Sequence, residues 1–341
     1  MTPFDAERSG PETGRSAALL AEVCGGIRDG MDEVEANIRA WSASPNPLIA
    51  DLGSYLFQET GKRLRPALLL LSAKVSGYSG PNAPYLAAVV EIIHTASLIH
   101  DDIVDNSGTR RGRPSVHSVW GPNITVLLGD FLFIKSIGLA LRTGDDRIIR
   151  LLADLSARMI EGELTEYAHG GDLGIAESRY YEIIDMKTAS LFTAASRIGG
   201  ILGKLSPGPE SDLAEAGRKL GMAFQIMDDL LDFDGDAGTI GKPVLSDLAE
   251  GRITLPLIHA LNDGAGGSAE RLAGMVGRRD LDASARDEVL SILRGSGSLE
   301  YAQGKAREYV DGARALLARF PDSPERQALF RFADLVLERE R

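Results

Sequence analysis

The stretch that decides the fold is residues 84–105, PYLAAVVEIIHTASLIHDDIVD. Its apolar residues recur at the spacing of one helix face, at Leu86, Val89, Val90, Ile93 and Ala96. This period predicts an α-helix, and Pro84 suits its first turn, where a backbone N–H has no partner within the helix.

The same period recurs along the chain between short clusters rich in Gly, Pro or Asp. It predicts further helices over 66–77, 123–142, 146–169, 177–200, 211–234, 252–262, 284–294, 299–319 and 324–339. No segment alternates apolar and polar residues as a half-buried strand does, and no long linker divides the chain. We therefore expect an all-α fold, with residues 17–341 in a single domain.

The first 16 residues, MTPFDAERSGPETGRS, contain no apolar run and mix Pro, Gly, Ser and charges. Such a segment is typical of a disordered start and resembles neither a secretion signal nor a transit helix. Uninterrupted apolar stretches such as PALLLLSA (66–73) fall short of the ~18 residues that a spanning helix needs. We expect a soluble, cytoplasmic protein with no transmembrane segment.

The charge balance excludes some partners. Acidic residues outnumber basic ones by 49 to 37, which leaves a formal charge of -12, so the chain as a whole does not attract nucleic acid. An anionic partner must meet a local basic cluster. The single cysteine, Cys24, excludes an internal disulfide and a cysteine-based metal site, which fits a reducing compartment.

One acidic pattern occurs twice, as DDIVD at 101–105 and DDLLD at 228–232. On a helix, positions i and i+4 lie about 5–6 Å apart, so Asp101 and Asp105 share a face, with Asp102 beside them. Two carboxylates at that distance repel by roughly 3 kcal/mol at an effective dielectric near 20. Each motif also ends a long helix, where the helix dipole disfavours anions. Folding alone would not select this arrangement.

These motifs could simply be solvated helix ends without a binding function. Their flanks are apolar, however: SLIH precedes the first motif and FQIM precedes the second. Carboxylates at the mouth of an apolar cavity need cations, and all-oxygen ligands favour Mg²⁺ or Mn²⁺. Because Mg²⁺ typically binds through one or two carboxylates plus phosphate oxygens, the motifs indicate a phosphorylated ligand. A calcium-loop interpretation of 232–243 fails at Ala237 and Pro243, where Gly and Glu are required.

Short basic clusters could meet such an anion. They are GKRLRP at 61–66, RRGRP at 110–114, KTASLF at 187–192 and GKP at 241–243. Arginine suits bidentate phosphate binding and lysine acts as a point charge. Singly, each could be a solvated loop charge, but two of the clusters follow the acidic motifs closely. His94, two turns before Asp101, could donate to phosphate or be a satisfied core histidine.

Taken together, these segments carry a resemblance. GKRLRP, EIIHTASLIHDDIVDNSGTRRG, KTASLF, FQIMDDLLDF and GKPVLSDLAEGRITLPLI resemble, in order, segments of the trans-isoprenyl diphosphate synthases, the polyprenyl synthetase family. The similarity runs from about residue 50 to the C-terminus. It implies an antiparallel helical bundle around a central cavity, with the two motifs facing each other, and usually a homodimer.

The resemblance also implies roles for individual residues. Metal ligands would be Asp101, Asp102, Asp105, Asp228, Asp229 and Asp232. The middle Asp of each motif would either bind the metal directly or hold the residues that do. Isopentenyl diphosphate would be bound by Lys62, Arg65, His94 and Arg111. The allylic diphosphate would meet Arg110, Lys187, Thr188, Gln225 and Lys242. Catalysis would rest chiefly on Asp101, Asp105, Lys187 and Asp228. Arg252, where many relatives carry Lys, is left out.

The implied reaction is a Mg²⁺-dependent head-to-tail condensation of isopentenyl diphosphate with an allylic diphosphate. Bound Mg²⁺ and basic side chains would stabilise the departing diphosphate, and the chain needs no Ser or Cys nucleophile. In the family, aromatic residues just before the first motif go with short products, whereas the small pair Ala96 and Ser97 resembles long-chain, octaprenyl-type enzymes. Simple helix packing also accounts for small residues there.

Three alternatives remain open. A farnesyl or geranylgeranyl synthase would make shorter products with the same motifs. A class I terpene cyclase would use an Asp-rich motif without needing isopentenyl diphosphate. A non-catalytic subunit would bind Mg²⁺ and diphosphate without turnover. The hydrophobic product of a synthase could pass to a membrane.

Overall fold

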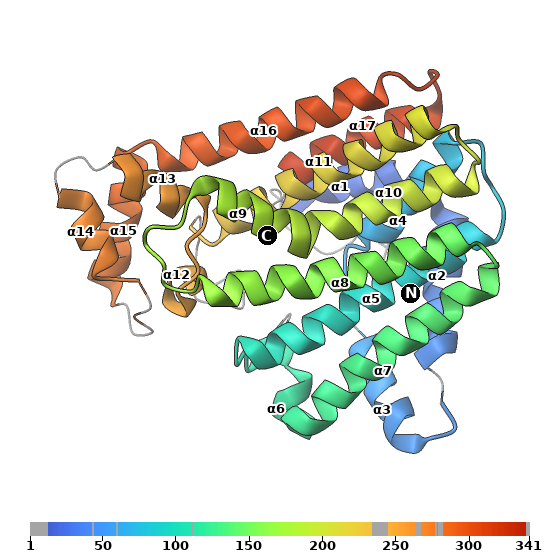
Figure 1. Cartoon of the computed structure of the whole chain (residues 1–341), viewed down its shortest axis with the longest axis horizontal. Helices are drawn as coiled ribbons and strands as arrows, with labels where there is room; N and C mark the ends of the chain where they lie inside the picture. Colours follow the sequence, from blue (N-terminus) through green and yellow to red (C-terminus); the bar gives the residue numbers. More distant parts are fainter. Residues whose placement is uncertain are drawn as a thin grey trace. The chain divides into compact units, whose positions relative to one another are not determined.

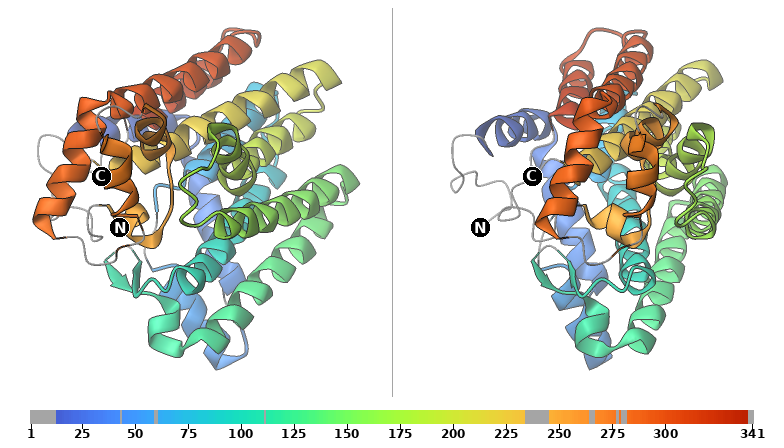
Figure 2. Two further views of the ribbon diagram at one scale, coloured as in Figure 1. Left: turned by 60° about the vertical axis from the view of Figure 1, so that its left-hand side comes forward. Right: turned by 90° about the vertical axis from the view of Figure 1, so that its left-hand side faces the viewer.

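The computed structural model describes residues 13–42, 44–58, 61–110, 112–233, 245–263, 267–276, 278 and 282–338. Helices account for nearly all regular structure within these ranges (Figure 1). The strands found there are β1 (Thr109–Arg110) and β2 (Arg113–Pro114), a two-residue antiparallel pair that follows helix α5 (Figure 2). The predicted all-α fold is confirmed.

The chain divides into two compact units, each assembled from three stretches of sequence. The first consists of Met1–Ser156, Leu191–Gly217 and Arg314–Phe332, and the second of Ala157–Ser190, Arg218–Ala313 and Ala333–Arg341. Helices with residues in both units are α8 (Asp146–Ala168), α10 (Ser190–Leu202), α11 (Pro207–Leu231), α16 (Ser298–Leu317) and α17 (Pro324–Leu337). The predicted single domain with a disordered start up to residue 16 stays a prediction; helix α1 begins at Thr13.

The first unit is built around α5, which packs against α2, α4 and α7. Its elements are α1 (Thr13–Gly25), α2 (Arg28–Ser42), α3 (Pro47–Leu56), α4 (Leu64–Val75), α5 (Asn82–Val104), α6 (Val116–Trp120), α7 (Pro122–Ala140) and the 3₁₀ turn η1 (Leu141–Thr143). Helix α5 is buried over most of its length, from Ala83 to Ile99. The period of residues 84–105 therefore marks the central helix of this unit.

Local chemistry sets two features of the first unit. Asn46 caps α3 by accepting a hydrogen bond from the backbone N–H of Leu48 at 3.0 Å, and Pro47 occupies the first helical position. Helices α4 and α10 cross closely at Gly199, where a Cβ would lie 2.5 Å from Cβ of Ser72. Glycine is required there because any larger residue would push the two helices apart.

The second unit contains α9 (Glu177–Ile184), the π-helical turn η2 (Asp185–Ala189), α12 (Ser246–Glu250), α13 (Leu255–Asp263), α14 (Ser268–Ala273) and α15 (Ala283–Gly295). Helix α13 contacts α9, α14 and α15. The single helix predicted over 177–200 is in fact interrupted by η2. The helix predicted from residue 252 begins at Leu255, which leaves Pro256 in the first turn, where its missing N–H is tolerated.

Two described helices, α5 and α7, are long and apolar enough to cross a membrane by length and composition. In α5, 67% of the 18-residue apolar stretch is buried within the fold, whereas in α7 only 39% of the corresponding stretch is buried. A mostly buried apolar helix is also typical of a protein core, so α5 needs no membrane. The expected absence of a transmembrane segment stays a prediction.

Candidate active site

The first acidic motif lies at the C-terminal end of α5 in the first unit. Helix α5 ends at Val104, and Asp105 is its cap residue. Asp102 is buried and accepts hydrogen bonds from Nε and Nη2 of Arg110 in β1, at 2.8 and 2.5 Å. Asp101 and Asp105 are partly exposed. The hairpin that follows α5 thus returns a cation to the middle carboxylate.

The second acidic motif lies at the C-terminal end of α11 in the second unit. Asp229 is buried and accepts hydrogen bonds from Oη of Tyr180 at 2.6 Å and from Nε2 of Gln225 at 2.7 Å. Gln225 in turn accepts a hydrogen bond from Oγ1 of Thr188 at 2.7 Å. Asp228 is exposed. Burial and the charge of Asp229 raise the pKa of Tyr180 well above its usual value, which keeps this hydroxyl a donor.

The two motifs therefore share one design within their own units. The middle Asp is turned inward and held by the protein's own donors, whereas the first Asp faces outward. This arrangement favours an indirect role for Asp102 and Asp229, in which they position neighbouring side chains and do not bind the metal themselves. Because the motifs belong to different units, the expectation that they face each other stays a prediction.

Asp232 lies in a crowded acidic setting just after α11. It accepts hydrogen bonds from Oγ of Ser246 at 2.7 Å and from the backbone N–H groups of Ser246 and Asp247 at 3.0 Å. Burial and the charge of Asp247 nevertheless raise the pKa of Asp232 to about 6. Arg252, omitted from the predicted site, donates to Oδ1 of Asp247 from Nη2 at 2.7 Å. Sequence reasoning missed Asp247, although it lies within a quoted segment.

Lys187 lies in the π-helical turn η2, a conformation often found at functional sites. Its Nζ lies 2.7 Å from Oε2 of Glu163 and also pairs with Glu166, both on α8. The turn brings Lys187 to the two glutamates and Thr188 to Gln225. The two glutamates were not predicted, because nothing in their spacing distinguishes them from other charges on a helix surface.

Two residues predicted for isopentenyl diphosphate meet in the first unit. Nη1 of Arg65, in the first turn of α4, lies 3.1 Å from Nε2 of His94 on α5. The guanidinium of Arg65 also lies 4.9 Å from the ring centroid of Phe192. Lys62, just before α4, is exposed. His94 is therefore paired with a site residue and partly exposed, rather than enclosed in the apolar core.

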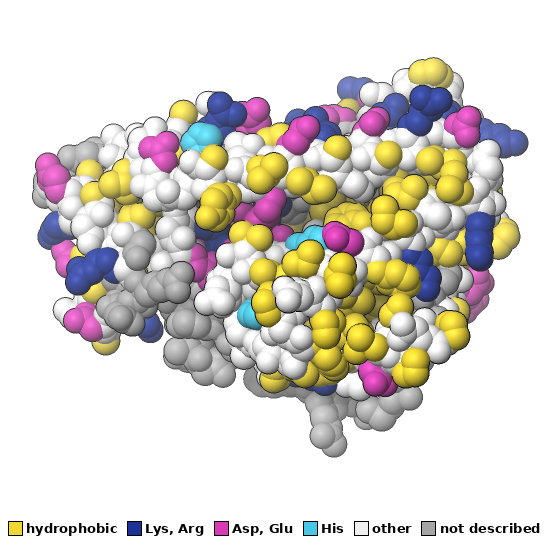
Figure 3. Space-filling view, turned by 60° about the horizontal axis from the view of Figure 1, so that its bottom comes forward, with side chains coloured by type: hydrophobic (Ala, Val, Ile, Leu, Met, Phe, Trp, Pro, Cys, Tyr) yellow, Lys and Arg dark blue, Asp and Glu magenta, His cyan; other side chains and the backbone are white. Residues whose placement is uncertain are grey.

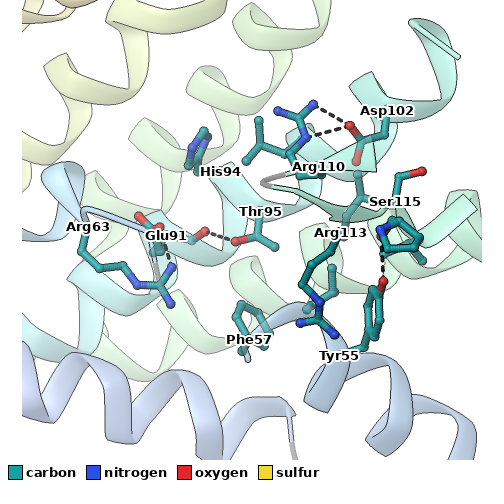
Figure 4. Close-up of a pocket in the computed structure, with 15 residues that line it drawn as sticks. Tyr55, Phe57, Arg63, Glu91, His94, Thr95, Asp102, Arg110, Arg113 and Ser115 are labelled. Atoms are coloured by element: carbon teal, nitrogen blue, oxygen red, sulfur yellow. Dashed lines mark hydrogen bonds and ion pairs between the residues drawn. The ribbon is translucent and has the colours of Figure 1, made fainter. Parts of the chain in front are cut away.

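A pocket opens beside these residues within the first unit (Figure 4). It contains three of the predicted residues, His94, Asp102 and Arg110, and its rim includes Tyr55, whose hydroxyl donates to the carbonyl of Pro114 at 2.7 Å. Its other lining residues are Leu56, Phe57, Arg63, Glu91, Thr95, Leu98, Ile99, Arg113, Pro114, Ser115 and Val116. The pocket joins aromatic and aliphatic walls to cationic side chains, which suits a small ligand with an apolar and an anionic part.

The pair predicted to control product length lies on α5. Ala96 is fully buried, and Oγ of Ser97 donates to the carbonyl of His94 at 2.8 Å. Their role in product length stays a prediction. Two further predicted residues, Arg111 and Lys242, lie outside the described residues, as does most of the calcium-like segment.

The carboxylates of the two acidic motifs determine which metal ion the site could hold. No group of three or more His, Cys, Asp or Glu side chains gathers to hold a metal within the part of the chain that the structure describes. Asp101 and Asp105, which are partly exposed, and Asp228, which is exposed, offer hard carboxylate oxygens. This set fits Mg²⁺, which commonly takes one or two carboxylates and completes its octahedron with phosphate oxygens and water.

Comparisons with known proteins point the same way. The family model described as Polyprenyl synthetase matches residues 46–293. Octaprenyl diphosphate synthase of Escherichia coli (strain K12) is 37% identical over 315 residues, which cover 91% of this chain and 96% of that protein. A short chain isoprenyl diphosphate synthase of Methanothermobacter thermautotrophicus is 39% identical over 84% of this chain and 89% of its own. The crystal structure of a polyprenyl synthase from Caulobacter crescentus CB15, complexed with calcium and isoprenyl diphosphate, superposes with a TM-score of 0.89 at 36% identity, covering 94% of this chain and 98% of that one.

The raised pKa of Asp232 predicts a pH dependence of stability. Between pH 3.8 and about 6 the folded state holds a proton that the unfolded state releases, so the free energy of unfolding falls as pH rises through this window. Relative to Asp232→Asn, wild type should lose about 1–3 kcal/mol between pH 4 and pH 7. Urea unfolding of both proteins in EDTA measures this, since other groups titrate in both and cancel. Parallel pH profiles would contradict the assignment.

Proposed function

Because this chain belongs to the polyprenyl synthetase family, and is therefore a prenyltransferase, we propose that it condenses isopentenyl diphosphate with an allylic diphosphate in a Mg²⁺-dependent reaction. The observation that carries the proposal is the shared design of the acidic motifs. In each, the middle Asp is buried on protein donors while the first Asp is directed outward. Outward carboxylates at the negative ends of helices need divalent cations.

We assign the roles as follows. Mg²⁺ ions held by Asp101 and Asp105 in the first unit, and by Asp228 in the second, would supply Lewis-acid stabilisation of the departing diphosphate. Arg65 and His94 bind the diphosphate of isopentenyl diphosphate, and Lys187 and Thr188 face the allylic substrate.

The bonds balance without a protein nucleophile. The allylic C–O bond breaks with its electron pair on diphosphate, and the double bond of isopentenyl diphosphate forms the new C–C bond. The released diphosphate then takes the proton that this carbon skeleton loses.

The proposed domain and location follow the family match. Residues 46–293 include stretches of both compact units, which supports one polyprenyl synthetase domain over 17–341. Cys24 is buried, and burial raises the pKa of its thiol to about 11, so it is unreactive. We propose a cytoplasmic location because a chain with a single cysteine fits a reducing compartment.

The test of this function is incubation of the protein with farnesyl diphosphate, isopentenyl diphosphate and Mg²⁺. Consumption of isopentenyl diphosphate with release of diphosphate supports a synthase. Consumption of the allylic substrate alone would instead indicate a terpene cyclase, and binding without turnover would indicate a non-catalytic subunit.

Removing one outward carboxylate should abolish most turnover. Asp101→Asn and Asp228→Asn should each lower kcat by about 10²–10³-fold, because charge stabilisation of the leaving group weakens. Asp322→Asn is the matched control, since Asp322 is an exposed carboxylate paired with Arg326 away from the motifs. Steady-state kinetics and thermal unfolding should show loss of activity with an intact fold. Activity within threefold of wild type would refute the metal assignment.

We further propose that the product is a long-chain all-trans polyprenyl diphosphate. Relatives named for long and for short products are similarly identical to this chain, so overall identity does not decide. Support comes from Ala96 and Ser97, which are small residues at the fifth and fourth positions before Asp101, where an aromatic side chain would add bulk.

Bulk at this point should shorten the product. Ala96→Phe and Ser97→Phe should each shift the products to chains shorter by several isoprene units, and chromatography of the dephosphorylated alcohols measures this. Ser97 is the milder site, because it is partly exposed whereas Ala96 is fully buried. Ser97→Ala, which removes only a hydroxyl, is the control. Unchanged products in both Phe variants, with folding intact, would refute the role of these residues.

We also propose a homodimer. Leu127, Ile134 and Leu141 recur every seven residues along α7 and η1, and their exposed fractions are 67%, 75% and 57%. Hydrophobic side chains gather broadly on the face turned forward in Figure 3. A soluble monomer rarely leaves such a stripe in water, and a heptad-spaced stripe packs well against a second copy of itself.

Charges in this stripe should separate the dimer. Leu127→Glu with Ile134→Glu should raise the dimer dissociation constant by about 100-fold or more, because two carboxylates would be buried against apolar surface. Analytical ultracentrifugation measures this, with Leu48→Glu, at an exposed residue on α3, as the control. A monomeric wild type that floats with phospholipid vesicles would instead assign the stripe to a membrane.

A further inference from the structure

One arginine of the GKRLRP segment is turned inward. Arg63 is 94% buried, since its exposed fraction is 6%. Its Nε donates to Oε1 of Glu35 on α2 at 2.6 Å, and its Nη1 donates to Oε1 of Glu91 on α5 at 2.7 Å. Burial alone would lower the pKa of Arg63, but the two carboxylates outweigh burial and raise it. Arg63 therefore stays a cation, held between two carboxylate side chains at the point where α4 begins.

Folding stability does not account for this triad. Arg63 has φ +48° and ψ +38°, a left-handed conformation that is strained for a residue other than glycine. Its Nη2 is buried without a hydrogen-bond partner among the described residues. Buried ion clusters are in general no more stabilising than well-packed apolar residues. A strained, incompletely bonded charge at a helix start indicates a function beyond packing.

The triad stands among the residues assigned to isopentenyl diphosphate. Lys62 directly precedes Arg63 and is exposed, and Arg65 follows two residues later. His94, the partner of Arg65 at 3.1 Å, lies one turn after Glu91 on α5. Figure 4 shows Arg63 beside Glu91 in the wall of the pocket that also contains His94. One guanidinium thus ties the start of α4 to α5 between the side chains that must meet the same diphosphate.

We propose that Arg63, anchored on Glu35 and Glu91, is a positioning residue for the isopentenyl diphosphate site. By holding the backbone of residue 63 in the left-handed conformation, it turns Lys62 outward and sets Arg65 against His94. The inference rests on the proposed function. It assigns the triad to isopentenyl diphosphate and not to the allylic substrate, whose assigned residues Arg110, Lys187 and Thr188 are held by other contacts.

The decisive variant removes the triad without leaving a buried charge. Arg63→Met alone would leave two buried carboxylates without their cation. The variant is therefore combined with Glu35→Gln and Glu91→Gln, which removes all three charges and keeps the side-chain volumes similar. The triple variant should fold, yet its Kd and KM for isopentenyl diphosphate should rise about tenfold or more, because misplaced ligands bind the same diphosphate less well. The KM for farnesyl diphosphate should stay within about twofold of wild type. Arg63→Lys keeps the positive charge but lacks the planar guanidinium that bonds both glutamates. It should also raise the KM for isopentenyl diphosphate, and it replaces the triple variant if that variant fails to fold.

A second buried charge cluster in the same unit provides the control. Glu210 is buried, and its carboxylate accepts from Nη2 of Arg147 at 2.5 and 2.7 Å and from Nε of Arg197 at 3.1 Å. Glu210→Gln should lower the unfolding temperature without changing either KM. This control separates a loss of stability from a loss of positioning.

The Kd for isopentenyl diphosphate and the KM values of the two substrates distinguish the possible outcomes. Isothermal calorimetry with isopentenyl diphosphate alone, followed by steady-state kinetics with both substrates, gives the Kd and the two KM values. A selective rise for isopentenyl diphosphate supports the proposal. Wild-type values in a folded triple variant, or equal rises for both substrates, would overturn it while leaving the proposed function intact. A wild type that neither binds nor consumes isopentenyl diphosphate would remove the proposed function and the inference together.

Discussion

The constraint on which the structure depends is the placement of like charges at the negative ends of long apolar helices. Asp101 and Asp105 close α5, and Asp228 and Asp232 close α11. Mutual repulsion and the helix dipole both oppose this placement. The fold tolerates it by holding Asp102, Asp229 and Asp232 on its own donors. For the more exposed carboxylates we propose cations from solution.

Much of the remaining chemistry follows from holding those inward carboxylates. In the first unit, the β1–β2 hairpin places Arg110 against Asp102. In the second, Tyr180 and Gln225 hold Asp229, and Gln225 also holds Thr188 in the π-helical turn. The same principle recurs in the Arg63 triad, where buried charge sets the direction of exposed charge. In each case a buried polar contact orients an outward-facing group, which is how a rigid scaffold prepares a site for a charged ligand.

The helical period predicted the central helices and the position of both motifs, because burial of α5 and α11 imposes a regular apolar pattern. No helix was predicted before residue 66, although Met31, Val34 and Ile38 in α2 are fully buried at the same spacing. The π-helical turn was missed because one inserted residue leaves the apolar period nearly unchanged.

Contacts between distant residues were beyond the reach of spacing arguments. Asp247 and the glutamates that pair with Lys187 carry no local pattern, and GKRLRP does not reveal that Arg63 points inward. The direction of a charged side chain depends on which carboxylates the tertiary fold places behind it, and a single sequence does not contain that information in local form. Residue types and motifs were therefore predictable, whereas their hydrogen-bond partners were not.

The most direct test of the central claim is a crystal structure of the protein soaked with Mn²⁺ and a non-reactive thiolo analogue of farnesyl diphosphate. Anomalous scattering would locate the metal. The account predicts Mn²⁺ peaks on the outward carboxylates Asp101, Asp105 and Asp228, with diphosphate oxygens completing the coordination, and Asp102 still bound to Arg110. Diphosphate bound by basic residues alone, with no metal at either motif, would contradict it.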